Sequence, residues 1–439
     1  MFIELKVARK RLEHALEQYL TACTTVRNYA EHPMFSHTRE HSARMASEMT
    51  AIVACQEKMD RAKKCISQAI NHSPFVARVN SLPDEILARI FHIAIGLQPC
   101  FTDINDSELK NERKRVAFAQ VPERLSHVCC RWRRLAFSLS TLWQHIDINM
   151  DATDALARAK ARMTRTGRLL LDVHIIGSLL EVEELEQWFA LAAPRTKSLT
   201  MIICDVYDTH ESVLTAWFRH CSPGTFSHLT VWKEIASGPD DDLILDFRNP
   251  FSYNELEFEE VFRRLESLRL RQLYPYWTSP MFRGLTELHL ASHQLQPSQL
   301  LAIAASQLIG ILQSSPKLRV LRLDLKVVDD QPGMEALRTP VRFEDLEVLD
   351  LSTESRQPDL EQLELLLPLI IPGTKPLQLT INELDEGHLI LEEVVQAFFA
   401  RSNVTRLKLV YDGSNYSIGQ NLLREIGSLA KRSTSRSFC

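Results

Sequence analysis

Long apolar runs are missing from this chain of 439 residues. No stretch of 18 apolar residues occurs, so the sequence predicts no membrane-spanning helix. Charged Glu4 and Lys6 stand within the first six residues where a signal peptide would need an apolar region, so we expect no such peptide. The nine cysteines are odd in number and form no C-x-x-C pair, which favours free thiols. These features predict an intracellular protein of the cytoplasm or nucleus.

Glycine is also scarce, at 13 residues, which disfavours Gly-rich phosphate-binding loops. The sequence has no Walker loop, dinucleotide fingerprint, G-x-S-x-G elbow or protein-kinase motif. The formal net charge of -5 gives no reason to expect nucleic acid or an anionic membrane as a partner. We therefore expect neither an enzyme nor a bound cofactor.

One motif is a candidate metal site. His37-Thr38-Arg39-Glu40-His41 has the H-x-x-E-H spacing, which places two imidazoles one helical turn apart with a glutamate as base. A catalytic zinc also needs a third ligand on a neighbouring element and a walled cleft. Because the motif opens a polar helix, we predict no metal site here; stoichiometric zinc in the purified protein would instead favour a metallopeptidase.

What the sequence does contain begins with two amphipathic helices in residues 1–72. The first apolar stripe has spacings of three and four residues, and Pro33 ends it. The stripes comprise Leu5, Ala8, Leu12, Ala15, Tyr19, Cys23 and Val26, then Met45, Met49, Ile52, Cys55, Met59, Ala62 and Ile66. The pattern predicts a helical hairpin. It either drives dimerisation as a coiled coil or packs on the next domain.

The segment 73–150 carries two ordered apolar signatures. The first is Leu82-Pro83-x-Glu85-Ile86-Leu87-x-x-Ile90-Phe91. The second is one helical pattern, Leu125-x-x-Val128-Cys129-x-x-Trp132-x-x-Leu135-Ala136, followed by Leu142-Trp143. Between them, about 96–120, mixed charges with Gly96 and Pro99 predict an exposed insertion.

These signatures resemble an F-box, and the helical region before them resembles the layout of fungal F-box-like proteins. The resemblance implies a three-helix module that docks on the Skp-type adaptor of a cullin–RING ubiquitin ligase. By the motif match, the adaptor-binding residues are Leu82, Pro83, Ile86, Ile90, Phe91, Leu125, Val128, Trp132 and Leu135. They are contacts or the core beneath them. The alternative is that all of them close a self-contained three-helix core.

Residues 165–430 repeat the pattern Leu-x-x-Leu-x-Leu. Marker residues recur at intervals averaging about 30 residues, namely Leu199, Leu229, Leu268, Leu288, Leu321, Leu349, Leu377 and Leu407. Helix-like stretches lie between them, at 182–193, 299–314, 360–367 and 391–400. A strand followed by a helix in repetition predicts a parallel sheet. We interpret the array as an irregular leucine-rich-repeat solenoid, with an ordinary α/β domain as the alternative.

The overall prediction is an α plus α/β chain with a hairpin, a three-helix F-box, a leucine-rich-repeat solenoid and a disordered tail at 431–439. Strand alternation directs the residues between the leucines outward, onto a candidate client-binding face. Those residues are Arg269, Arg271, His289, Arg322, Asp324, Asp350, Gln378 and Lys408. The predicted function is a substrate receptor that holds a Skp-type adaptor and an unknown client protein. The alternative is a non-ligase scaffold that self-associates through residues 1–72.

Overall fold

The computed structural model divides the chain into two compact units, Met1–Pro83 and Asp84–Cys439. The residues it describes are 2–31, 38–72, 78–96, 121–177, 182–203, 209–233, 260–292, 302–330, 339–351, 360–382 and 389–410. Residues 97–120 of the predicted insertion, His37 of the H-x-x-E-H motif and the tail 431–439 lie outside them.

The first unit contains the two predicted helices. They are α1 (Phe2–Ala30) and α2 (Arg39–His72), followed by a short 3-10 helix, η1 (Arg78–Ser81). The prediction of two helices is confirmed. Their apolar stripes remain open to solvent, with no residue of α1 buried. The Tyr19 hydroxyl of α1 donates to the Glu48 carboxylate of α2 at 2.7 Å.

The second unit begins with a helical module. It contains α3 (Asp84–Gly96), α6 (Val121–Val128), α7 (Cys130–Ser138) and the 3-10 helix η4 (Ser140–Trp143). The single helix predicted through the second signature is wrong. The chain is extended at Cys129, with φ -157° and ψ 171°, and the Cys129 thiol accepts the Trp132 N–H at the start of α7. A side-chain cap at this break makes two helices from one continuous apolar pattern.

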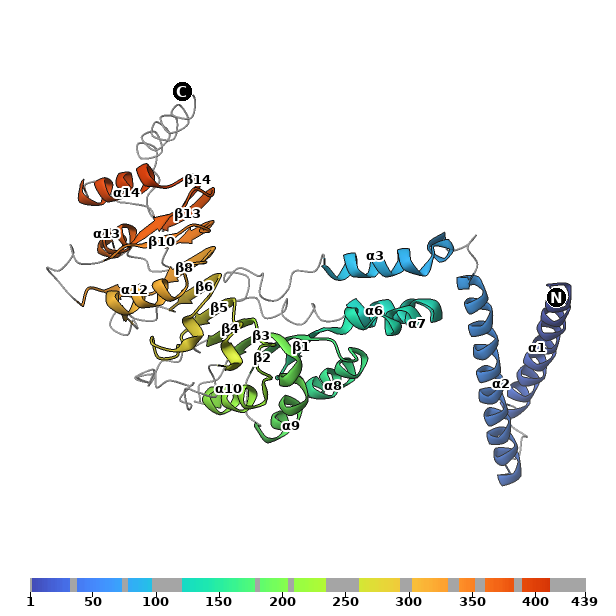
Figure 1. Ribbon diagram of the computed structural model, residues 1–439. Helices are drawn as coiled ribbons and strands as arrows, with labels where there is room; N and C mark the ends of the chain where they lie inside the picture. The colour runs from blue at the N-terminus through green and yellow to red at the C-terminus, as the bar shows by residue number, and fades with distance from the viewer. Residues whose placement is uncertain are drawn as a thin grey trace. The chain divides into compact units, whose positions relative to one another are not determined.

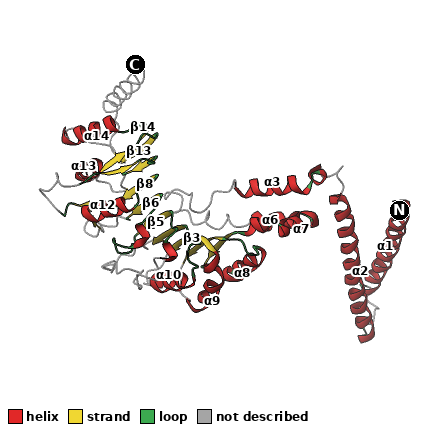
Figure 2. Ribbon diagram, viewed as in Figure 1, coloured by secondary structure: helices red, strands yellow, loops and turns green. Residues whose placement is uncertain are grey.

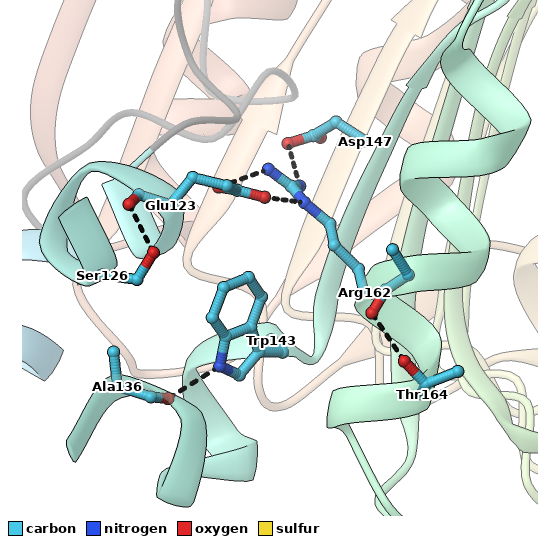
Figure 3. Close-up of polar contacts among 8 residues, drawn as sticks. Glu123, Ser126, Ala136, Trp143, Asp147, Arg162 and Thr164 are labelled. Carbon is cyan, nitrogen blue, oxygen red and sulfur yellow. Dashed lines mark hydrogen bonds and ion pairs between the residues drawn. The ribbon is translucent and has the colours of Figure 1, made fainter. Parts of the chain in front are cut away.

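A small core holds the module together. Its fully buried members are Phe91, Ala136, Leu142 and Trp143. The Trp143 indole N–H donates to the Ala136 carbonyl at 2.8 Å (Figure 3), which satisfies its only donor. The Arg165 guanidinium lies 4.6 Å from the centre of the Trp143 ring, a cation–π contact.

The rest of the second unit is built on one all-parallel sheet of ten strands (Figure 1). The order is that of the chain: β1 (His145–Asn149), β2 (Leu171–Gly177), β3 (Thr196–Ile203), β4 (His228–Lys233), β5 (Ser267–Arg271), β6 (Glu287–Ala291), β8 (Val320–Asp324), β11 (Val348–Asp350), β13 (Leu377–Asn382) and β14 (Val404–Val410). The predicted parallel sheet is therefore confirmed. It begins at β1, immediately after the helical module.

Helices run along one side of this sheet, as the red and yellow elements of Figure 2 show. They are α8 (Ala155–Arg165), α9 (Val182–Ala192), α10 (Thr209–His220), α12 (Ala305–Ser314), α13 (Leu360–Leu369) and α14 (Leu389–Arg401), with 3-10 turns η5 (Ala193–Arg195) and η6 (Pro280–Phe282). Two small parallel pairs accompany them: β7 (Ala302–Ala304) with β9 (Lys326–Val328), and β10 (Val341–Phe343) with β12 (Ile370–Pro372).

The core lies between the sheet and these helices. The apolar residues of neighbouring strands stand in register, so that Leu229, Leu268, Leu288, Leu321 and Leu349 follow one another across the sheet. All of them are fully buried. Parallel strands that each present one apolar face to covering helices form a continuous layer of buried side chains.

The predicted leucine-rich-repeat solenoid is wrong. The structure is an α/β fold, a ten-stranded all-parallel sheet with helices, which was the alternative interpretation. The Leu-x-x-Leu-x-Leu pattern specifies only a strand with one apolar face, and such a strand suits either architecture. The connections between the strands are too irregular for a regular repeat. Some contain helices of up to 13 residues, as in α14, whereas β5 and β6 are joined through only the short η6.

Candidate functional site

A row of polar side chains crosses the sheet on the face opposite the leucines. One residue from each strand takes part, because each pairs in register with the next. The row is Asp147, His174, Thr200, Thr230, Arg269, His289, Arg322, Asp350, Thr380 and Lys408. We call it the polar row. Successive side chains on a strand point to opposite faces of the sheet, so these residues, which are neighbours of the buried leucines in sequence, lie on the other face.

All eight residues predicted to face a client lie on this side of the sheet. Arg269, His289, Arg322, Asp350 and Lys408 belong to the polar row itself. The remaining three, Arg271, Asp324 and Gln378, lie two residues away along their strands and flank it. The alternation argument therefore placed these side chains together correctly.

Accessibility changes along the polar row. His174, Thr200 and Thr230 on β2 to β4 are buried. From β5 onward most of the row is accessible: Arg269 is half-buried and Arg322 and Lys408 are exposed, although Thr380 on β13 is buried. Arg269 is held by Glu287 of β6, with 3.2 Å between NH2 and Oε2. The accessible part of the polar row thus lies on β5, β6, β8, β11 and β14.

At the β1 end, three side chains converge on one another. His145 Nε2 lies 3.0 Å and His174 Nδ1 lies 3.3 Å from the same carboxylate oxygen, Asp147 Oδ1. The two imidazole rings meet edge to face, with centroids 4.3 Å apart. The backbone explains this: His145 and Asp147 are two residues apart on β1, and His174 of β2 is the register partner of Asp147. We call these three residues the His–Asp–His cluster.

An arginine connects the His–Asp–His cluster to the helical module. Arg162 of α8 donates through Nε and NH2 to the two carboxylate oxygens of Glu123 on α6, at 2.7 and 2.9 Å. Its Nη1 lies 4.0 Å from Asp147 Oδ2 (Figure 3), whereas both histidines contact the other carboxylate oxygen, Oδ1. The Arg162 side chain is only 8% exposed. Such a bidentate arginine fixes both position and orientation of its partners.

The environment keeps Asp147 ionised. Burial by itself raises the pKa of the Asp147 carboxyl, but hydrogen bonds from His145 and His174 outweigh burial and hold that pKa well below its ordinary value. The cluster therefore presents a carboxylate between two imidazoles. Among the described residues, it is the one group of three His, Cys, Asp or Glu side chains whose possible metal-ligand atoms all lie within 4.8 Å of one another.

The predicted adaptor-binding residues divide by burial. Phe91 is fully buried in the module core, and Leu125, Trp132 and Leu135 pack against that core. Ile86, Ile90 and Val128 are 45%, 38% and 56% exposed. Leu82 and Pro83 lie at the end of the first unit, half-buried and exposed.

The sequence analysis missed His145, Asp147, His174 and Arg162. A signal did exist for the first two, because His145-Ile146-Asp147-Ile148 alternates and so places both polar side chains on one face of a strand. His174 and Arg162 gave none, since their roles depend on which strand and helix lie beside β1. His41, the described histidine of the H-x-x-E-H motif, lies on the exposed helix α2.

No protein-family model matches this chain, and no curated protein matches its sequence. The resemblance to F-box proteins therefore stays a prediction that depends on the two signatures. No helix in the described part of the chain is both long and apolar enough to cross a membrane.

Proposed function

We propose that this chain is a substrate-recognition subunit of an intracellular cullin–RING ubiquitin ligase. In this proposal the helical module binds a Skp-type adaptor, and the accessible part of the polar row binds a client protein. The chain itself performs no chemistry, because ubiquitin transfer belongs to other subunits of the ligase.

The observation that carries the proposal is an apolar stripe on α3. Leu87 and Phe91 are fully buried on one side of this helix, while Ile86, Ile90 and Ile93 are 38–52% exposed on another. Spacings of four and three residues place the three isoleucines on one helical face. Burying each against a partner contributes roughly 1 kcal/mol. An amphipathic helix with a second apolar stripe is typical of a docking element.

Co-purification of the full chain with a Skp-type adaptor tests this proposal. We expect a one-to-one complex with the wild type and its loss in an Ile86→Asp/Ile90→Asp double variant. Leu191→Asp is the matched control, because Leu191 is an equally apolar side chain, 57% exposed, on α9. Circular dichroism checks that all three proteins are folded. Failure of folded wild type to bind, or equal binding by the double variant, would contradict the adaptor proposal.

The client side of the proposal depends on charge. Arg322 and Lys408 are exposed members of the polar row. We expect Arg322→Glu/Lys408→Glu to change which cellular proteins become ubiquitinated in the presence of the ligase, while adaptor binding stays intact. An unchanged set of ubiquitinated proteins would contradict a client site on this face.

A second candidate function, self-association, is favoured by the first unit. Leu20 on α1 and Met49 and Val53 on α2 are 51–68% exposed, and helices bury exposed apolar side chains of this kind when they assemble. Sedimentation of the full chain over a range of concentrations tests it. A dimer that Met49→Glu/Val53→Glu converts to monomer would support the scaffold function, whereas a monomeric wild type would exclude it.

A further inference from the structure

We propose that the His–Asp–His cluster, His145, Asp147 and His174, binds a divalent transition metal ion of the zinc class. This inference does not depend on the ligase proposal, because it concerns the β1 edge of the sheet and not the adaptor or client surfaces.

The cluster has the dimensions of a tetrahedral metal site. Zinc binds imidazole nitrogen and carboxylate oxygen at about 2.0–2.1 Å, so two such ligands lie about 3.3 Å apart. The separations from Asp147 Oδ1 are 3.0 Å to His145 Nε2 and 3.3 Å to His174 Nδ1. All three ligand atoms lie within 4.8 Å of one another. An ion can therefore sit among them after small side-chain rotations, with each imidazole turning a nitrogen lone pair toward it.

The ligand types select the class of ion. Two imidazoles and one carboxylate suit zinc and its neighbours in the first transition row, whereas calcium and magnesium favour sites made of oxygen. Three protein ligands leave a fourth position for water or for a group from a bound partner.

A second shell of contacts is already in place. Arg162 NH1 approaches Asp147 Oδ2 at 4.0 Å, which leaves Oδ1 for the ion. The guanidinium charge is balanced by Glu123, which Arg162 binds through both carboxylate oxygens. Outer contacts of this kind hold ligand side chains in a fixed orientation. They also extend the site to α6, so that a bound ion would tie the helical module to β1 and β2.

Accessibility suits a site that exchanges ions with solvent. The His174 side chain is 5% exposed, and Asp147 and His145 are 22% and 36% exposed. One ligand is thus held rigidly while another is reached from outside. Among the described strands, β1 is the first of the sheet and pairs only with β2, so a metal ion bound to its side chains would stabilise an edge strand.

Zinc titration of the full chain in competition with a chromophoric chelator tests the site. The protein is first stripped of metal and alkylated, because the exposed thiols of Cys23, Cys55 and Cys65 would bind zinc themselves. We expect one equivalent of tight binding in the wild type, lost in Asp147→Asn and in His145→Gln. Arg162→Lys should weaken it about 10–100-fold.

Two controls separate this site from others. His228→Asn removes a histidine from the same sheet, and His41→Ala removes one from the H-x-x-E-H motif. Both variants should still bind one equivalent of zinc. Cobalt substitution adds a spectroscopic readout, since tetrahedral and octahedral cobalt absorb differently. The proposal is overturned if the folded wild type binds no zinc, if His145→Gln and Asp147→Asn still bind one equivalent of zinc, or if His41→Ala abolishes zinc binding. In the first case the cluster is a hydrogen-bond network only.

Discussion

Arg162 lies on an ordinary amphipathic helix, yet its side chain links two parts of the second unit. It joins Glu123 of α6 to Asp147 of β1 and is almost completely buried. A buried charge is stable only when its partners are fixed, and removing one partner leaves the other without compensation. At the scale of single residues, this arginine is therefore where the helical module and the sheet depend on each other.

Replacing Arg162 by methionine should lower the free energy of unfolding by about 2–3 kcal/mol, because Glu123 and Asp147 lose their shared cation. The effect is smaller than for a fully buried pair, since Glu123 is 33% exposed. Urea unfolding followed by tryptophan fluorescence measures it. Arg158→Met is the matched control: Arg158 pairs with Asp154 on the surface of α8, and its loss should change stability by less than about 0.5 kcal/mol. Equal effects of the two changes would contradict this account.

At the scale of elements, the end of β2 requires glycine. Gly177 has φ +107°, a conformation that other residues rarely adopt, and a Cβ there would lie 2.8 Å from Asp151 Oδ1. The chain needs this geometry because the Met150 N–H donates to the Ile176 carbonyl at 2.7 Å, which continues the pairing of β1 with β2. Gly177 thus lets the strand end close to its neighbour.

Gly177→Ala should destabilise the protein by about 1–3 kcal/mol, through backbone strain and displacement of Asp151. Gly310→Ala is the paired variant, because Gly310 lies inside α12 with nothing within 4 Å of an added Cβ. That change should raise stability by about 0.5–1 kcal/mol. Thermal unfolding of both variants is the measurement; the same sign for the two would count against the argument.

At the scale of the whole molecule, the large core of the sheet buries a thiol and a phenol, and these two groups make the free energy of unfolding depend on pH in the alkaline range. Cys221 is buried beside the aromatic residues of α10, and burial raises the pKa of its thiol from 9.0 to about 12. Burial also raises the pKa of the Tyr274 hydroxyl, whose O–H donates to the Ala291 carbonyl. Both groups stay protonated in the native state when the unfolded chain has already released those protons.

Stability should therefore be full below pH 9 and fall above it, by about 1.4 kcal/mol per pH unit for Cys221 until its native pKa is reached. The unfolded state binds fewer protons in this window, so raising the pH favours it. Thermal midpoints of the second unit's transition between pH 8 and 11 test this. Cys221→Ala should flatten the slope, and an identical slope in the variant would contradict the role of the thiol.

Local patterns in the sequence predicted much of the secondary structure. The stripes of residues 1–72 predicted α1 and α2, and the Leu-x-x-Leu-x-Leu copies predicted strands such as β5, β6 and β8. The helix-like stretches at 182–193 and 360–367 became α9 and α13. Helices α8 and α10 were missed, because α8 is rich in arginine and alanine and α10 carries scattered polar residues.

What the sequence by itself determined is many of the elements and the apolar face of the repeated strands, because a repeat of two or 3.6 residues is encoded within a few neighbours. The predicted leucine markers also align in register from β3 to β11. Only the tertiary structure decided which strands lie side by side and where the register departs from these markers. Leu379, not the predicted marker Leu377, aligns with Leu407. The same lateral pairing assembled the polar row, brought His174 to Asp147, and made the chain an α/β fold. Which strands become neighbours is set by contacts between residues far apart in the chain, because parallel strands are joined by long crossover connections, and no local pattern contains that information.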